Sequence, residues 1–260
     1  MIRLKTKEEI EQLKEGGKIL ADIVKSLQKE VKPGVSTGYL NSLAEKLIAD
    51  YNCVPSFKNY RSSQSDKIYP FALCASLNEV IVHQLPSDSV ILKEGDILTL
   101  DLGLWYQAKP KRLCVDAAVT LGIGQVSAVS NKLIETARMA LDLAIKEAVP
   151  GKTLGDIGSV IDKYVSSQGF SVIKELVGHG VGYDVHEDPE ILNFGRPNSG
   201  VVLKPGMVLA IEPMVSSGDW RIKKCKDGFG YQTFDNSLSS HFEATVAITD
   251  GGNTNLTPIN

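Results

Sequence analysis

The sequence predicts an α+β fold built from two halves that are related by a pseudo-twofold axis. Three observations support this prediction: both halves contain similar helical segments, both contain similar β-rich runs with an acidic residue, and the order of these elements is the same. We therefore expect a single domain over residues 1–260, with an internal duplication of about 6–125 and 126–252. Packing about such an axis would bring equivalent positions of the two halves together.

Each half begins with two predicted helices. Residues 33–51 and 150–168 both open with Pro-Gly and continue with apolar residues at helical spacing. A further helical pattern precedes each of these segments, and Thr6 with Glu9 forms a capping-box pattern at the start of the first one. The helices of the second half thus repeat those of the first.

Each half continues with two predicted strands that contain one acidic residue each. The run around Asp101 aligns without a gap with the run around Glu212, and the run around Asp116 aligns with the run around Glu243. A lone acid in a strand is usually a solvated edge residue, but acids at matched positions inside apolar runs are not explained in this way. Buried carboxylates need cations, and two divalent ions would balance four negative charges.

The histidines indicate the class of metal. His179 lies between two glycines and His186 follows in the same segment, while His83 ends a β-rich run. His241 lies two residues before Glu243, so the two would share a strand face, and its role stays open at this point. One imidazole among several carboxylates suits Mn, Fe, Co or Zn. Two such ions about 3.5–4 Å apart activate a bridging water, which predicts metal-assisted hydrolysis.

The composition argues against other classes of function. The chain has 28 Lys and Arg against 31 Asp and Glu and a formal net charge of -3, so we expect no direct binding of nucleic acid. We expect no membrane span and no signal peptide, because charged residues interrupt the apolar stretches and occupy the N-terminal region. The four cysteines form no Cys-x-x-Cys pair. These features favour a cytoplasmic protein with reduced thiols.

Six short segments carry the residues described above, and they read NEVIVHQLP, LTLDLGL, CVDAAVT, GHGVGYDVHEDP, LAIEPMV and SSHFEAT. In this order and spacing they resemble the type I methionine aminopeptidases, metallopeptidases of the pita-bread fold. The resemblance extends from about Thr6 to Thr249. It implies a curved antiparallel sheet that lines the site, with helices on the outer face. It also implies a monomer that hydrolytically removes the N-terminal methionine of nascent proteins and peptides when the second residue is small, with the ribosome as a candidate partner.

The resemblance further implies a role for each site residue. Five positions match the family's metal ligands: Asp101, Asp116, His179, Glu212 and Glu243. Asp116 and Glu243 would bridge two ions of Co, Mn, Fe or Zn, whose identity the sequence leaves open. A bridging hydroxide would act as nucleophile, with Glu212 as proton relay and His83 and His186 as catalytic substrate contacts. An apolar set would line the methionine pocket: Phe57, Tyr60, Tyr69, Cys74 and Phe229.

The chain departs from the family pattern at a few positions. Val185 replaces a common Phe, Phe229 replaces the usual Trp, and the Gln-Tyr-Glu-His motif becomes His-Phe-Glu-Ala at 241–244. These changes keep the metal ligands but leave the pocket shape and the role of His241 open. Two stretches, near 61–70 and 107–113, are longer than in the compact bacterial form. We expect a flexible surface loop at the first.

The second stretch, 107–113, carries three basic residues: Lys109, Lys111 and Arg112. Because nascent chains are the family's substrate, the hypothesis for this basic tip is contact with the ribosome or the substrate chain.

Three alternative classes fit the sequence less well. Xaa-Pro peptidases of the same fold usually carry a separate N-terminal domain, for which the length leaves no room. Type II methionine aminopeptidases carry a helical insertion late in the second half, but the stretch between His186 and Glu212 is too short for it. Non-catalytic pita-bread proteins that bind RNA or proteins typically lose metal ligands, and this chain keeps all of them.

Overall fold

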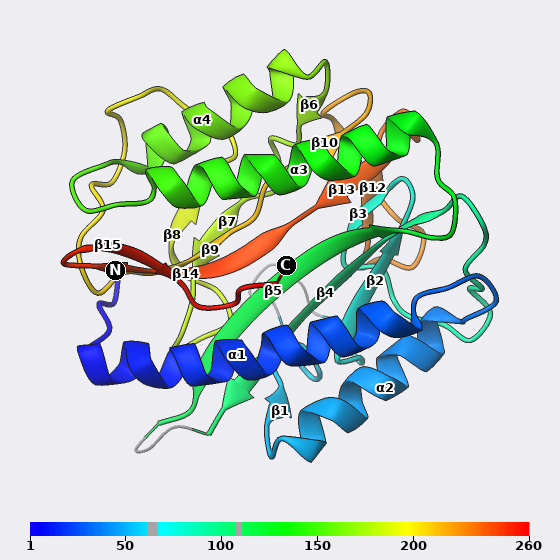
Figure 1. Ribbon diagram of the computed structural model, residues 1–260, viewed down its shortest axis with the longest axis horizontal. Coiled ribbons are helices and arrows are strands. Elements are labelled where there is room, and N and C mark those ends of the chain that lie inside the picture. Colours follow the sequence, from blue (N-terminus) through cyan, green and yellow to red (C-terminus); the bar gives the residue numbers. More distant parts are fainter. Residues whose placement is uncertain (62–66, 108–110, 260) are drawn as a thin grey trace.

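The computed structural model describes residues 1–61, 67–107 and 111–259 (Figure 1). The extension near 61–70 is therefore described only at its two ends. In the extension near 107–113, Lys111 and Arg112 are described, whereas Lys109 lies outside the described residues.

The helices form two pairs, as the repeated sequence pattern predicts. They are α1 (Lys7–Glu30), α2 (Thr37–Asp50), α3 (Ala128–Glu147) and α4 (Leu154–Ser167). The predicted capping box is present at α1, where the Thr6 side chain accepts from the Glu9 N–H and the Glu9 carboxylate accepts from the Thr6 N–H. Thr153 and Asp156 form an equivalent box at α4. Local side-chain chemistry thus fixes where these helices begin.

Among the described residues, the strands form a large antiparallel sheet and two small ones. The strands are β1 (Val54–Pro55), β2 (Leu73–Leu77), β3 (Val80–Val82), β4 (Ile97–Tyr106), β5 (Leu113–Gly122), β6 (Ser171–Val172), β7 (Gly178–Gly180), β8 (Glu187–Ile191), β9 (Val208–Ile211), β10 (Met214–Ser216), β11 (Ile222–Lys224), β12 (Tyr231–Thr233), β13 (Ser239–His241), β14 (Glu243–Thr249) and β15 (Gly252–Asn255). The large sheet runs β1-β4-β5-β14-β9-β7-β8, with β2 on β4 and β15 on β14.

The middle of the large sheet joins the two predicted halves. Strands β4 and β5 come from the first half, β14 and β9 come from the second, and β5 pairs with β14 between them. The strands whose sequences align therefore take symmetric places in the order β4-β5-β14-β9. This arrangement agrees with the predicted α+β class, while the exact limits of the two halves stay a prediction.

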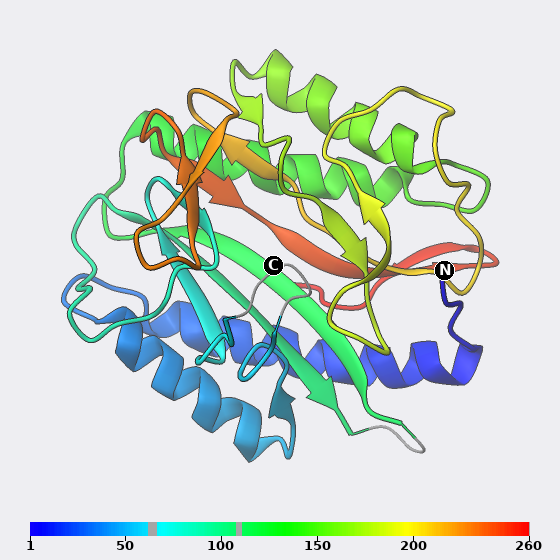
Figure 2. The ribbon, with the colours of Figure 1, turned by 180° about the vertical axis from the view of Figure 1, so that it is seen from behind.

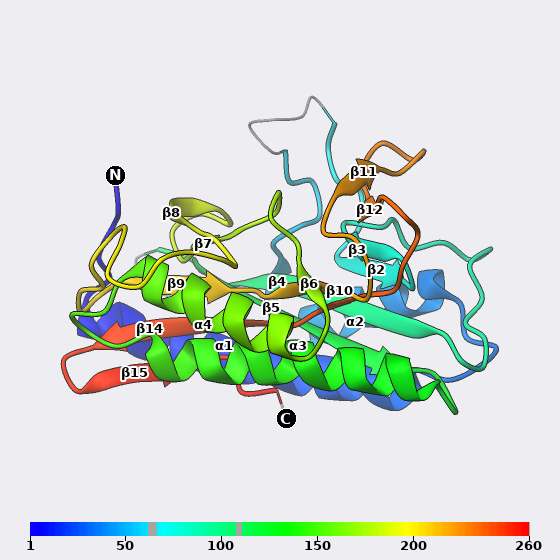
Figure 3. The same cartoon turned by 90° about the horizontal axis from the view of Figure 1, so that it is seen from above.

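The main core lies between the helices and one face of the sheet. Figure 3 shows α1 and α3 on that side of the sheet, whereas β8, β11 and β12 lie on the other side. Leu13 and Leu20 of α1 are fully buried in this core. Helix α1 packs closely against the C-terminal segment at Gly17, where a Cβ would lie only 2.0 Å from the Leu256 carbonyl oxygen.

Successive side chains of β5 point to opposite faces of the sheet. Val115 lies in the main core near Gly16 of α1, so Asp116, the next residue, points to the opposite face. That face is turned toward the viewer in Figure 2, where the segments around β8, β11 and β12 lie nearest the viewer. Both faces of β4 and β5 are buried as a result.

Candidate metal centre

The strand register places three of the predicted ligands on one face of the sheet. Asp101 on β4 and Glu243 on β14 are both paired with Ala118, on opposite sides of β5. Directly paired residues of antiparallel strands point to the same face. Asp116 lies two residues before Ala118 on β5 and therefore shares this face.

The remaining two predicted ligands reach the same face from β9 and β7. The register between β14 and β9, continued by one position beyond β9, sets Glu212 opposite Glu243. His179 on β7 pairs with Ala210, which lies two residues before Glu212. The structure thus brings together all five side chains that the sequence predicts as ligands. Backbone pairing alone explains why they converge.

The glycines that flank His179 have a steric role. A Cβ at Gly178 would lie 2.4 Å from the Ala210 carbonyl oxygen, and a Cβ at Gly180 would lie 2.2 Å from the Asp188 carbonyl oxygen. Strand β7 is therefore tightly enclosed by β9 and β8, and only glycine fits on either side of the histidine. This crowding holds His179 in register.

Burial makes the charged forms of the four carboxylates unfavourable. Each is less than a tenth exposed, and this burial, with Glu212 as the next cause, raises the pKa of Asp116 to about 8. Burial also raises the pKa values of Asp101, Glu212 and Glu243 well above their usual range, and for Asp101 and Glu243 the neighbouring carboxylates add to the effect. A bound divalent cation would have the opposite influence, because it favours the charged form of each ligand.

The tautomer of His179 shows where a cation fits. Its Nδ1 lies 2.9 Å from the Gly180 carbonyl oxygen, so Nδ1 carries the proton and donates it. Nε2 is then an acceptor, and it lies 3.5 Å from Oε1 of Glu212, which is also an acceptor when this carboxylate is charged. Two acceptors face each other here, and ligand atoms of Asp116, His179 and Glu243 all lie within 4.8 Å of one another. This donor set fits a transition metal held by oxygen and nitrogen.

Two histidines line the opening of the site. His83 and His186 are both exposed to solvent, unlike His179. The Tyr60 hydroxyl lies 2.7 Å from Nδ1 of His186, and the rings of His179 and His186 lie 4.3 Å apart. Desolvation by the surrounding protein atoms lowers the pKa of each imidazole to about 4. For His83 the charges of His186 and His241 lower the pKa further. Both rings are thus neutral at physiological pH.

The predicted pocket residues do not all gather in one place. Cys74 on β2 pairs with Asp101, so it adjoins the ligands, and the rings of Tyr69 and Phe229 meet edge to face at 5.8 Å. Tyr60 lies instead beside His186. Phe57 is half-buried and packs against the main core, and so does the fully enclosed Val185.

One buried side chain beside the site, that of Glu187, was not singled out from the sequence. Glu187 has a buried carboxylate that accepts from the Lys5 Nζ at 2.9 Å and from the backbone N–H groups of Tyr183 and Asp184. These contacts fix the turn that carries His186. Nothing in the sequence pairs Lys5 with Glu187, because the contact joins residues far apart in the chain.

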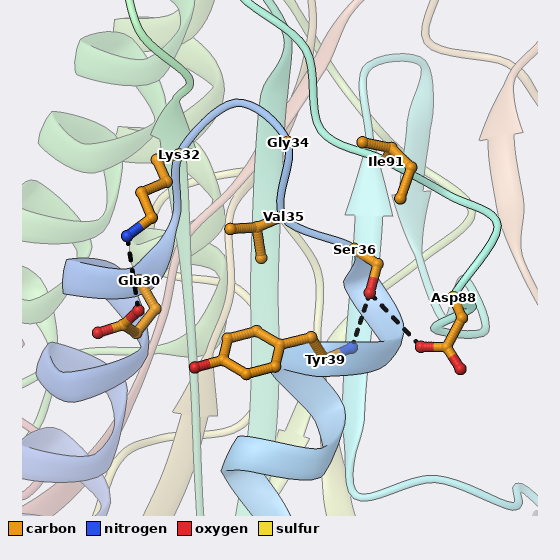
Figure 4. Close-up of a pocket in the computed structure, with 8 residues that line it drawn as sticks. All are labelled: Glu30, Lys32, Gly34, Val35, Ser36, Tyr39, Asp88 and Ile91. Carbon is orange, nitrogen blue, oxygen red and sulfur yellow. Dashed lines mark hydrogen bonds and ion pairs between the residues drawn. The ribbon is translucent and has the colours of Figure 1, made fainter.

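Two surface hollows lie outside the ligand cluster. One is lined by Arg3, Lys111, Arg112 and Tyr183; there the Lys111 ammonium lies 5.0 Å from the centre of the Tyr183 ring. The other lies where α1 connects to α2, and its lining residues are drawn in Figure 4.

Among the described residues, no helix combines the length and the hydropathy that a membrane crossing requires.

Comparison with known proteins agrees with this geometry. Residues 11–250 match the model of metallopeptidase family M24. The chain is 42% identical to the methionine aminopeptidase of Clostridium acetobutylicum and 42% identical to methionine aminopeptidase 1 of Bacillus subtilis, in each case over 97% of both chains.

Solved structures confirm the predicted pita-bread fold. The methionine aminopeptidase of Thermotoga maritima matches with a TM-score of 0.93 and 43% identity, over 99% of each chain. The prolidase of Pyrococcus horikoshii matches with a TM-score of 0.77 and 22% identity, over 99% of this chain and 64% of that one, which indicates a shared fold alone.

Proposed function

The chain belongs to metallopeptidase family M24, within its type I methionine aminopeptidases, and from this premise we propose how its residues act. Its reaction is the metal-dependent hydrolytic removal of an N-terminal methionine. The observation that supports the location of the site is the sheet face shared by Asp101, Asp116, Glu212, Glu243 and His179.

These five side chains would hold two divalent ions, in keeping with the facing acceptors of His179 and Glu212. Asp101 would help to hold one ion, His179 and Glu212 would help to hold the other, and Asp116 and Glu243 would contribute to both. Co, Mn, Fe and Zn all suit these donors. When bound, the ions would supply Lewis acidity toward the scissile carbonyl and activate the attacking water.

The side chains then divide the proton transfers and the binding of substrate. Glu212 would accept a proton from the attacking water and pass it to the leaving amine. His186 would donate from Nε2 to the scissile carbonyl oxygen, because the Tyr60 hydroxyl can occupy Nδ1. His83 would contact the scissile amide. The carboxylates around Asp101 would receive the free α-amine, which restricts cleavage to the chain terminus.

Selectivity would come from the apolar group beside Asp101. Tyr69, Cys74 and Phe229 offer aromatic and sulfur surfaces that suit a methionine side chain. Tyr60 and Phe57 would enclose the substrate nearer His186. We expect methionine to be released when the second residue is small.

The substrates would be nascent polypeptides in the cytoplasm, and the enzyme would act as a monomer. Arg3, Lys111 and Arg112 line one hollow at the surface, and such a group of cations suits contact with acidic side chains of the ribosome or of the substrate chain. Replacing Lys111 and Arg112 by Ala should weaken co-sedimentation with ribosomes while leaving peptide cleavage unchanged. Unchanged co-sedimentation would exclude this contact.

The activity is tested on metal-stripped protein. Mn, Fe, Co and Zn are each titrated against Met-Ala-Ser and against an Xaa-Pro peptide, and released methionine is measured. We expect methionine release that rises with added metal and no cleavage of the Xaa-Pro peptide. Cleavage of the Xaa-Pro peptide instead would contradict the proposed substrate.

A further inference from the structure

His241 is a buried imidazole that the proposed reaction does not use. Only 1% of the surface of His241 is exposed. Neither ring nitrogen has a hydrogen-bond partner among the described residues. Buried polar groups without partners destabilise a fold, so those that persist call for an explanation. The His241 ring lies beside Glu212, on the sheet face that carries the predicted metal ligands.

The backbone holds His241 firmly at the end of β13. Its N–H donates to the Thr120 hydroxyl at 2.9 Å, and its carbonyl oxygen accepts from the same hydroxyl at 2.8 Å. His241 also pairs with Met214 of β10. Neighbouring strands therefore fix the backbone of His241, and burial leaves its ring little room to move.

The ring faces the second oxygen of Glu212. His241 Nε2 lies 3.3 Å from Oε2, whereas Oε1 of the same carboxylate lies 3.5 Å from Nε2 of His179. Because His179 Nε2 is an acceptor, Oε1 is the oxygen that turns toward a cation. Oε2 of Glu212 is then available to accept a hydrogen bond. Nε2 of His241 can donate one when it carries the ring proton.

We propose that His241 is a positioning residue that donates a hydrogen bond from Nε2 to Oε2 of Glu212. This inference rests on the proposed function, in which Glu212 relays the proton. With Oε2 held by His241, the carboxylate keeps one orientation, in which Oε1 stays turned toward the proposed cation and the water beside it. A misdirected general base costs turnover more than binding, because its contribution is made in the transition state.

A conservative substitution supplies the control. A Gln side chain, like an imidazole, carries an N–H donor. His241→Gln therefore keeps the proposed donor, whereas His241→Phe keeps a planar ring without one. The pair separates hydrogen bonding from the filling of space.

The variants are compared by kcat and KM on Met-Ala-Ser and by metal content per chain. We expect His241→Phe to lower kcat by about 10-fold with KM changed by less than about twofold, at unchanged metal content. His241→Gln should recover most of the lost kcat. Full turnover in His241→Phe, loss of metal from it, or failure of His241→Gln to recover activity would each overturn the proposal.

A measurement on the zinc-loaded wild-type enzyme, in which Glu212 is held as the charged carboxylate, does not depend on the variants folding. With ¹⁵N-labelled histidine, NMR should show His241 as the Nε2–H tautomer, and its Nε2 signal should move in Glu212→Gln. The Nδ1–H tautomer would contradict donation to Glu212. Absence of methionine release by the metal-loaded wild-type enzyme would instead refute the proposed function, so the two failures are distinguishable.

Discussion

The floor and the rim of the site are built in different ways. The floor comprises the predicted ligands on β4, β5, β7, β14 and the end of β9, whose positions follow from strand pairing. The rim comprises His83 and His186, which lie outside strands and are exposed. His83 even has a left-handed backbone, with φ 62°, a conformation that a non-glycine residue keeps only when its surroundings enforce it. Regular pairing thus positions the floor, and individual tertiary contacts position the rim.

The largest effect should follow from a change in the middle of the floor. Asp116→Asn replaces a proposed bridging carboxylate by a neutral amide, and we expect at least about a 1000-fold loss of methionine release together with loss of metal. Metal content by elemental analysis and turnover on Met-Ala-Ser check this. Wild-type metal content in a folded variant would show that Asp116 is not a bridging ligand.

A change in the rim should separate turnover from metal binding. His83→Ala removes a side chain that we propose contacts the substrate and not the ions, so turnover should fall by about 100-fold while metal content stays the same. Its ring lies 6.2 Å from that of Tyr231, and Tyr231→Phe keeps this packing as a control. If His83→Ala lost metal, the division between floor and rim would be wrong.

A smaller effect is expected one step behind the rim, at the carboxylate that anchors the His186 turn. Glu187→Gln leaves the buried ammonium of Lys5 without its charged partner, so we expect the free energy of unfolding to fall by about 3 kcal/mol and turnover by about 10-fold. Urea unfolding and steady-state kinetics measure both.

Arg3→Gln is the matched control for this change, because the Arg3 side chain is 42% exposed in its pair with the same Glu187. An exposed pair contributes less than about 1 kcal/mol, so Arg3→Gln should change little. Equal losses in the two variants would mean that burial of Lys5 is not what matters.

The same difference explains what the sequence could predict. Period-two alternation and the repeat of the apolar runs are enough to place Asp101 and Glu212 on one face of the sheet. Helix starts are equally predictable, because capping chemistry is local. Contacts such as Lys5 with Glu187, or the orientation of His241 toward Glu212, depend on tertiary packing between distant segments. The split of the pocket residues between Cys74 and His186 is likewise not visible in sequence spacing.

The smallest predicted effect concerns the floor without its ions. Asp116 has a pKa of about 8 in the folded chain against an ordinary value of 3.8, so between these pH values the folded state binds the extra proton. Stability must then fall as pH rises toward 8, and Asp116 alone should remove about 1 kcal/mol between pH 7 and pH 8. The four histidines, whose pKa values are lowered from 6.5 in the folded chain, together oppose this trend by about 0.5 kcal/mol, so the net loss of stability is about half of that from Asp116 alone. Urea unfolding in a chelator should show the decline in stability, Asp116→Asn should reduce the decline, and saturating metal should abolish it, since bound ions favour the deprotonated ligands.

A metal-free chain that is equally stable at pH 7 and pH 8 would contradict this prediction. It would mean that the floor carboxylates are already charged at pH 7, and that water reaches the floor of the site as well as the rim.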